Sequence, residues 1–151
     1  MEQIVQLNSN ANLSEHFVLG EMTKSNSHPE VYNIPSHEAI ANLKRVCGWL
    51  EVLRSRASGP ICINSGYRSP QLNKKIGGVP TSNHLTGCAV DIRVADMGQL
   101  IRYAAILMDY ADESHQDFDE ILIEKNRYGA IWLHFAVRAK GNRRKVNFIQ
   151  A

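Results

Sequence analysis

The sequence lacks the segments that mark exported and membrane-spanning proteins. Its N-terminal stretch, MEQIVQLNSNANLSEHFVLGEMTK, has no basic region followed by an apolar one. No apolar run approaches the roughly 20 residues that a transmembrane helix needs. We therefore expect a protein made in the cytoplasm that does not contact a membrane.

Cysteine is scarce, and the spacing of the few cysteines carries no motif. The chain has three, Cys47, Cys62 and Cys88, an odd number without a Cys-x-x-Cys pair. This excludes a disulfide framework and argues against a thiolate zinc cluster. We predict that the three thiols are buried small side chains in a reducing compartment.

Strong charge, internal repeats and low-complexity linkers are also missing. The net charge of +2 and the isoelectric point near 8.5 are too mild to indicate a nucleic-acid partner. A chain of 151 residues with 44% hydrophobic content is typical of one globular domain, so we expect a single domain over residues 1–151 and a monomer.

Two stretches have the apolar periodicity of long helices. Residues 1–35 are polar and turn-rich and predict a loop-rich wrap around the core. After Ser36, a plausible N-cap, apolar residues recur every three or four positions as far as a Gly-Pro stop at 59–60. A second helix is predicted after Asp96, with Leu100, Ala104 and Leu107 on one face.

The remaining patterns indicate short strands. Residues 118–124 and 131–137 resemble a hairpin, and a short helix is expected in SPQLNKKIGG. The sequence therefore predicts an α+β fold in which two long helices pack on a small, mostly antiparallel sheet. Further strands are expected at 61–64 and 88–94, with an edge strand in the basic tail after residue 138.

Three polar residues stand where a sheet favours apolar ones. His84 lies in the loop before a strand, Asp91 lies inside AVDIRV, and His134 lies inside IWLHFAV. A buried carboxylate costs several kcal/mol unless it is paired or bound to a metal. Two imidazoles and a carboxylate suit catalytic Zn²⁺. An aspartate paired with a nearby arginine such as Arg93, beside ordinary strand histidines, is the competing interpretation.

A longer series of motifs closely resembles one enzyme family. SGYRSPQLN, a Gly-Gly pair, SNHLTGCAVDI, FDEILIE and WLHFAV occur in the order seen in the zinc D-alanyl-D-alanine carboxypeptidases, peptidase family M15. This family also includes phage peptidoglycan endopeptidases and vancomycin-resistance dipeptidases. The resemblance implies Zn²⁺ as cofactor, held on the sheet by His84, Asp91 and His134.

The resemblance also implies roles for residues around the metal. Arg68 is expected to orient the substrate carbonyl or carboxylate, as a guanidinium fork can; merely fastening its turn is the alternative. Ser82 is a weaker candidate for contacting the substrate or supporting a ligand. Trp132 shares a strand face with His134 and is predicted either to wall the cleft or to pack in the core.

The sequence offers two candidates for the general base. Several branches of the family carry an acid three residues before the last histidine, where this chain has Ile131. The branch of the family that this sequence resembles most has a carboxylate at the end of the preceding strand, which makes Glu124 the first choice and Glu120 the second. The hairpin register that would decide between them cannot be read from the sequence.

These features predict a zinc metallopeptidase that hydrolyses peptidoglycan stem peptides, as a carboxypeptidase or an endopeptidase. The expected location is cytoplasmic, with delivery to the cell wall by phage lysis as one route. The alternative is an inactive zinc-containing module that binds wall peptides or a protein partner, and the missing acid at Ile131 favours it.

Overall fold

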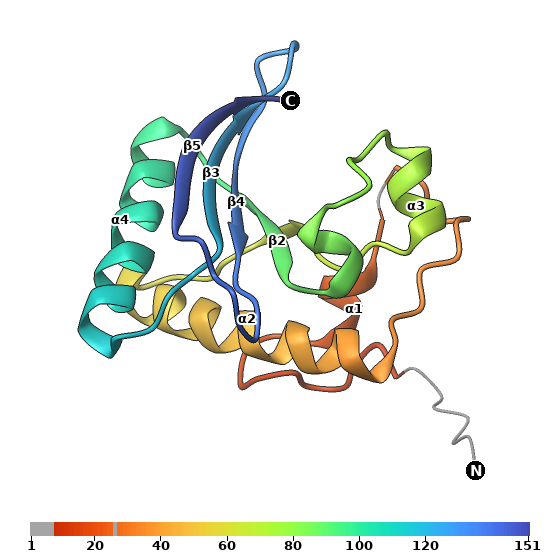
Figure 1. Cartoon of the computed structure of the whole chain (residues 1–151), viewed down its shortest axis with the longest axis horizontal. Helices are drawn as coiled ribbons and strands as arrows, with labels where there is room; N and C mark the ends of the chain where they lie inside the picture. Colours follow the sequence, from red (N-terminus) through yellow and green to blue (C-terminus); the bar gives the residue numbers. More distant parts are fainter. Residues whose placement is uncertain (1–7, 26) are drawn as a thin grey trace.

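A five-stranded sheet forms the centre of the protein. The computed structural model describes residues 8–25 and 27–151 (Figure 1). The strand order is β1-β2-β4-β3-β5; β5 runs parallel to β3, and the other neighbours are antiparallel. The strands are β1 (Ile63–Ser65), β2 (Ala89–Arg93), β3 (Glu120–Lys125), β4 (Ile131–Ala136) and β5 (Lys145–Gln150).

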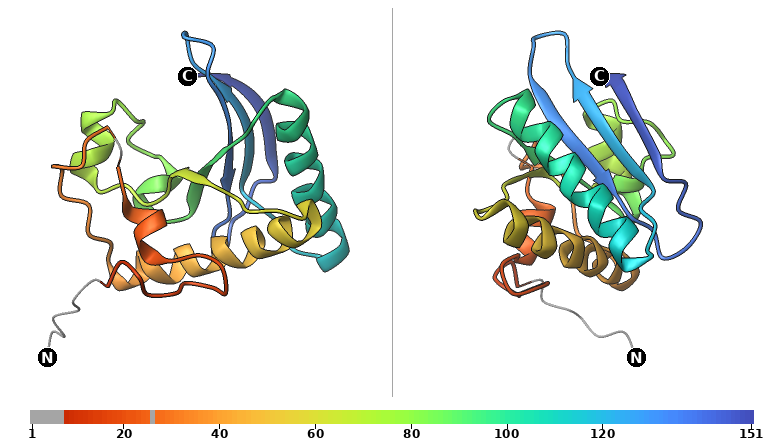
Figure 2. Two further views of the ribbon diagram at one scale, coloured as in Figure 1. Left: turned by 180° about the vertical axis from the view of Figure 1, so that it is seen from behind. Right: turned by 90° about the vertical axis from the view of Figure 1, so that its left-hand side faces the viewer.

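Two long helices cover one face of this sheet, as expected for an α+β fold. Helix α2 (His37–Ala57) begins at Ser36, whose side chain accepts a hydrogen bond from the Ala39 amide. Helix α4 (Met97–Ser114) begins at Asp96 in the same way. The shorter elements are α1 (Leu19–Thr23), α3 (Pro70–Lys75) and the 3₁₀ turn η1 (Asn83–Thr86). Figure 2 shows α3 and η1 on the side of the sheet away from α4.

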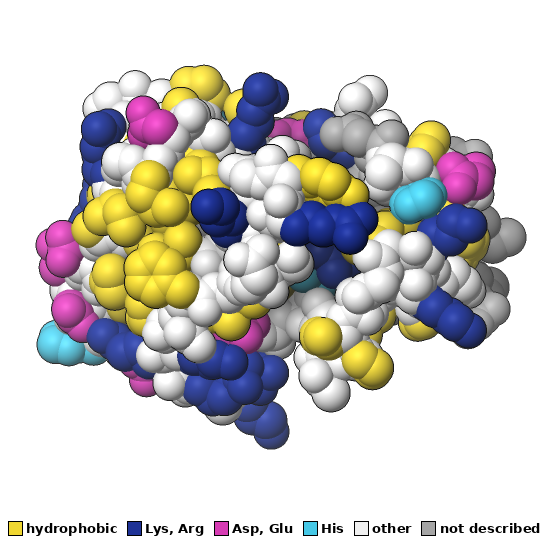
Figure 3. All heavy atoms as spheres, turned by 90° about the horizontal axis from the view of Figure 1, so that it is seen from above, with side chains coloured by type: hydrophobic (Ala, Val, Ile, Leu, Met, Phe, Trp, Pro, Cys, Tyr) yellow, Lys and Arg dark blue, Asp and Glu magenta, His cyan; other side chains and the backbone are white. Residues whose placement is uncertain are grey.

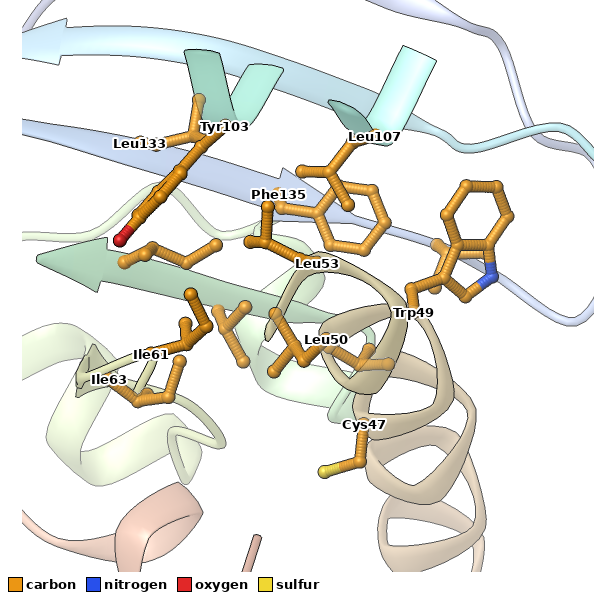
Figure 4. Close-up of a cluster of buried hydrophobic side chains, with 14 of the residues drawn as sticks. Cys47, Trp49, Leu50, Leu53, Ile61, Ile63, Tyr103, Leu107, Leu133 and Phe135 are labelled. Atoms are coloured by element: carbon orange, nitrogen blue, oxygen red, sulfur yellow. The ribbon is translucent and has the colours of Figure 1, made fainter. Parts of the chain in front are cut away.

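The hydrophobic core lies between the sheet and these two helices (Figure 4). The ring of Phe135 in β4 lies 5.5 Å from that of Trp49 in α2, and Leu133 of β4 lies beside Tyr103 of α4. Trp49 also meets Tyr110 of α4 edge-on at 4.8 Å. Because strand residues alternate between faces, an apolar core face leaves the opposite face of β2, β3 and β4 free for other side chains.

The structure corrects one prediction about cysteine. Cys47 and Cys88 are buried, but Cys62 is exposed. Ile61 and Ile63 take the inward positions of this extended stretch, so alternation turns Cys62 outward. The strand begins at Ile63, two residues after the predicted start.

The N-terminal wrap is described only in part, since residues 1–7 and 26 lie outside the described residues. Among the helices of the described residues, none combines the length and apolarity that a bilayer crossing requires.

Candidate metal centre

The register of the central strands gathers polar side chains on the sheet face opposite the core. Asp91 of β2 and Leu122 of β3 both pair with His134 of β4. Glu124 and Glu120 lie on the same face of β3, on either side of Leu122. This register, which the sequence left open, brings a carboxylate of β3 to each side of His134.

His84 reaches this face from η1, and its orientation is set by the backbone of the SGYR turn. Its Nδ1 lies 2.6 Å from the Gly66 carbonyl oxygen, which accepts the ring proton and directs Nε2 toward Asp91. A Cβ on Gly66 would come within 2.5 Å of the Met22 carbonyl oxygen, so only glycine fits there. Ser82 caps the turn by accepting a hydrogen bond from the His84 amide.

Three donors converge at one point, as the sequence predicted for a metal site. The ligand atoms of His84, Asp91 and His134 all lie within 4.8 Å of one another. Asp91 Oδ1 is 3.2 Å from His84 Nε2 and 3.2 Å from His134 Nδ1. The three residues are 2%, 7% and 6% exposed. Two imidazoles and one carboxylate are a donor set that suits Zn²⁺.

Arg68 extends across the edge of this cluster. Its Nη2 is 3.3 Å from Asp91 Oδ2, the carboxylate oxygen that does not face the two histidines. Its Nε donates to Ser65 Oγ and its Nη1 to Asn73 Oδ1. A Cβ on Gly78 would lie 2.1 Å from that Asn73 oxygen, so the Gly-Gly pair makes room for this contact. Asp91 therefore pairs with Arg68 and not with the exposed Arg93.

The two glutamates of β3 face different nitrogens of His134. Glu124 Oε1 is 3.4 Å from Nδ1, the nitrogen that also faces Asp91. Glu120 Oε1 is 3.0 Å from Nε2, on the opposite side of the ring. Only Glu124 is thus on the side where the three donors meet.

Burial and charge shift the pKa values of these groups in different directions. Burial opposes ionisation of Asp91, but both histidines outweigh it and hold the pKa of Asp91 well below its usual range. Burial lowers the pKa of His84. For His134, burial is outweighed by hydrogen bonds to Asp91 and Glu120, which raise its pKa to about 9.

The pKa values of the two glutamates move apart. Burial and then the charge of Asp91 raise the pKa of Glu124. Burial also acts on Glu120, but its hydrogen bond with His134 lowers its pKa below the ordinary value. A general base works best with a pKa nearer neutrality, which again favours Glu124 for that task.

Trp132 lies on the same strand face as His134, directly across from Glu124. It is half-buried, and its indole Nε1 is enclosed without a hydrogen-bond partner among the described residues. Its ring therefore borders the site. Seen from above, the surface is hollowed near its middle, with histidine and basic side chains inside the hollow (Figure 3).

Sequence reasoning missed the polar residues that support the site. Asn83, Asp119 and Arg143 form a hydrogen-bonded group behind His134. Asn73 fixes Arg68. Asn83 directly precedes His84 in SNH, and Asp119 directly precedes Glu120 in FDE. This proximity to predicted site residues was the sequence signal that could have indicated their role.

Within the described residues, fold and donor set together define an α+β metalloprotein with a His-Asp-His centre at its sheet. Comparison with known families adds that a model described as peptidase M15 matches residues 15–120, a stretch that includes His84 and Asp91 and ends before β4. The chain therefore belongs to the M15 peptidase family.

A curated relative agrees with this assignment. The zinc D-Ala-D-Ala carboxypeptidase of Streptomyces albus G is 28% identical over 97 residues. The matched stretch is 64% of this chain and 38% of that relative. The chain thus matches well under half the length of the relative.

Proposed function

We propose that the protein is a zinc-dependent peptidase that hydrolyses peptidoglycan stem peptides. The observation that carries this proposal is the convergence of His84, Asp91 and His134 within 4.8 Å, with Arg68 and Glu124 at the same point. Membership in the peptidase family and the activity named for the Streptomyces relative support the choice of reaction and substrate.

Zn²⁺ bound by these three residues would acidify a water molecule and polarise the peptide carbonyl. Glu124 is placed to accept the proton of the attacking water, because its carboxylate lies on the metal-facing side of His134. The same carboxyl group then donates this proton to the leaving amine. Burial and the charge of Asp91 raise the pKa of Glu124, which makes its carboxylate a stronger base than that of an ordinary glutamate.

Arg68 supplies positive charge beside the reacting carbonyl. Its guanidinium is largely buried, with 13% of the side chain exposed, and three neighbours fix its orientation. A preorganised donor of this kind stabilises a developing oxyanion or holds a substrate carboxylate. Trp132 borders the substrate, and Ser82 contributes by shaping the backbone of His84.

Digestion of purified muropeptides tests the proposal, with mass spectrometry to name the bond that is cut. The wild-type protein is expected to contain zinc and to cleave one of the D-Ala-D-Ala, L-Ala-D-Glu or cross-bridge bonds. Glu124→Gln should keep zinc and lose about 10²- to 10⁴-fold in kcat. The control is Glu15→Gln, at a glutamate whose side chain is 82% exposed.

Absence of cleavage of all three substrates by zinc-loaded wild-type protein would overturn the enzyme proposal. The alternative of an inactive module that binds wall peptides would then stand. Full activity in Glu124→Gln would instead remove Glu124 from the mechanism.

A further inference from the structure

The second ring nitrogen of His134 has a dedicated partner. Nδ1 faces Asp91 at 3.2 Å, and Nε2 lies 3.0 Å from Glu120 Oε1. The Glu120 side chain is 13% exposed, so this bond is mostly shielded from water. An ionised carboxylate can only accept hydrogen bonds, so Nε2–H donates.

This bond leaves Nδ1 as the nitrogen that can bind a metal. A histidine that donates one N–H to a carboxylate has its tautomer and its ring orientation fixed. His84 follows the same rule with the Gly66 carbonyl as its acceptor. Each histidine of the site thus has an outer partner, but only His134 has a charged one.

Asn83 ties Glu120 to the segment that carries the other histidine. Its Nδ2 donates to Glu120 Oε1 at 2.7 Å and to Asp119 Oδ2 at 2.8 Å. Asn83 directly precedes His84 in η1 and is itself buried. One amide group therefore links the positions of the two histidines across the sheet face.

Arginines of the loop between β4 and β5 also contact these polar residues. Arg143 Nη2 and Nε donate to both oxygens of Asp119, at 2.8 and 3.0 Å, which is a bidentate pair. Arg143 Nη2 also lies 3.5 Å from Glu120 Oε2. Arg138 Nε donates to Asn83 Oδ1 at 2.9 Å. The basic residues of this loop thus belong to a polar network around Asp119, in addition to flanking the edge strand β5.

We propose that Glu120 is the positioning residue of the metal centre, which holds His134 with Nδ1 toward the metal, and that Asn83, Asp119 and Arg143 hold Glu120 in place. This inference deepens the proposed function and rests on its zinc site. It assigns the two glutamates of β3 to separate tasks.

Zinc affinity, measured by competition with a chelator at fixed pH, tests this assignment without reference to activity. Glu120→Ala is expected to bind zinc about 10- to 100-fold more weakly, the usual loss when an outer partner of a ligand is removed. Glu120→Gln, which keeps an acceptor oxygen, should recover part of that affinity. Glu124→Gln is the matched control on the same strand face and should stay within about threefold of the wild type.

The network is tested by a second pair of variants in one loop. Arg143→Gln should weaken zinc binding severalfold, because Asp119 and Glu120 lose a shared partner. Arg144→Gln removes a neighbouring arginine that pairs with exposed Asp112 and Asp117 and should have no effect.

Nitrogen NMR of the zinc-loaded wild-type protein keeps the proposal testable if Glu120→Ala does not fold. We expect His134 to be metal-bound at Nδ1, with a protected proton on Nε2. Zinc on Nε2 would overturn the proposal, as would an unchanged affinity in Glu120→Ala or an equal loss in Glu124→Gln. If the variants lose zinc affinity as expected but the wild-type protein cleaves no substrate, this inference stands and only the proposed peptidase activity is removed.

Discussion

At the scale of single residues, two glutamates of the same strand differ in the role we propose for them, because their carboxylates face different atoms of one histidine. Glu120 and Glu124 lie on one face of one strand, yet Oε1 of each faces a different nitrogen of His134. Their pKa values accordingly shift in opposite directions. The sequence analysis ranked Glu124 before Glu120 from its place at the strand end, and that ranking stays a prediction. The orientation of the His134 ring, which separates the two glutamates here, could not be read from the sequence.

Arg68→Lys tests whether the planar guanidinium matters to the proposed reaction. Lysine keeps the charge but cannot contact Ser65, Asn73 and Asp91 at once, so its ammonium would be less well oriented. We expect kcat/KM on wall peptides to fall about 10²-fold, with the zinc content unchanged. Arg93→Lys, at an exposed residue near the end of β2, is the control. Equal kinetics for Arg68→Lys and wild type would show that charge alone suffices.

At the scale of elements, local patterns predicted the helices well, because a helix is built from contacts between near neighbours. Ser36 and Asp96 cap α2 and α4 as expected. The hairpin of β3 and β4 was also predicted. Its register was not, since a shift by one residue would satisfy local chemistry and move Glu124 to the other face.

The pairing of strands that are distant in the chain was even harder to predict from the sequence. The tail was predicted as an edge strand, and β5 does lie at the sheet edge. Its parallel pairing with β3 depends on how the loop from 137 to 144 crosses the sheet, which no local pattern encodes. The role of Asp119 in anchoring that loop was hidden for the same reason.

The loop anchored on Asp119 should give the metal-free protein a stability that depends on pH. Burial opposes the charge on Asp119, but Arg143, Asn83 and Arg138 outweigh it and lower its pKa to about 2. An unfolded aspartate has a pKa of about 4. Since the folded pKa is the lower one, the stabilisation is complete above pH 4 and is lost as pH falls toward 2.

Asp119→Asn measures this contribution by urea unfolding of the zinc-free protein. At pH 7 the variant should be less stable than wild type by about 1 to 2 kcal/mol, and the gap should shrink at pH 3 and below. Asp117→Asn, an exposed aspartate that pairs with Arg144, should cost less than about 0.5 kcal/mol. A gap that grows toward low pH would contradict the assignment.

At the scale of the whole molecule, the sheet separates two environments. One face is apolar and packs on α2 and α4 (Figure 4). The other face carries Asp91 and His134, which meet His84 of η1. Polar residues at 91 and 134 in otherwise apolar strands indicated the candidate site in the sequence, because a buried charge needs a partner. The supporting network was not predictable, since Asn83, Asp119 and Arg143 are ordinary polar residues until the fold brings them together.

Zinc should stabilise the whole fold, because its three ligands come from η1, β2 and β4, which are separate in the chain. A ligand that binds only the folded state at 100 times its Kd adds about 2.7 kcal/mol to the free energy of unfolding. Urea unfolding with free zinc at that level should show this gain over the chelator-treated wild-type protein. His84→Ala should lose nearly all of it, and His37→Ala, at an exposed histidine at the start of α2, should retain it. An equal gain in His84→Ala and wild type would mean that zinc binds elsewhere, and the three-residue centre would have to be abandoned.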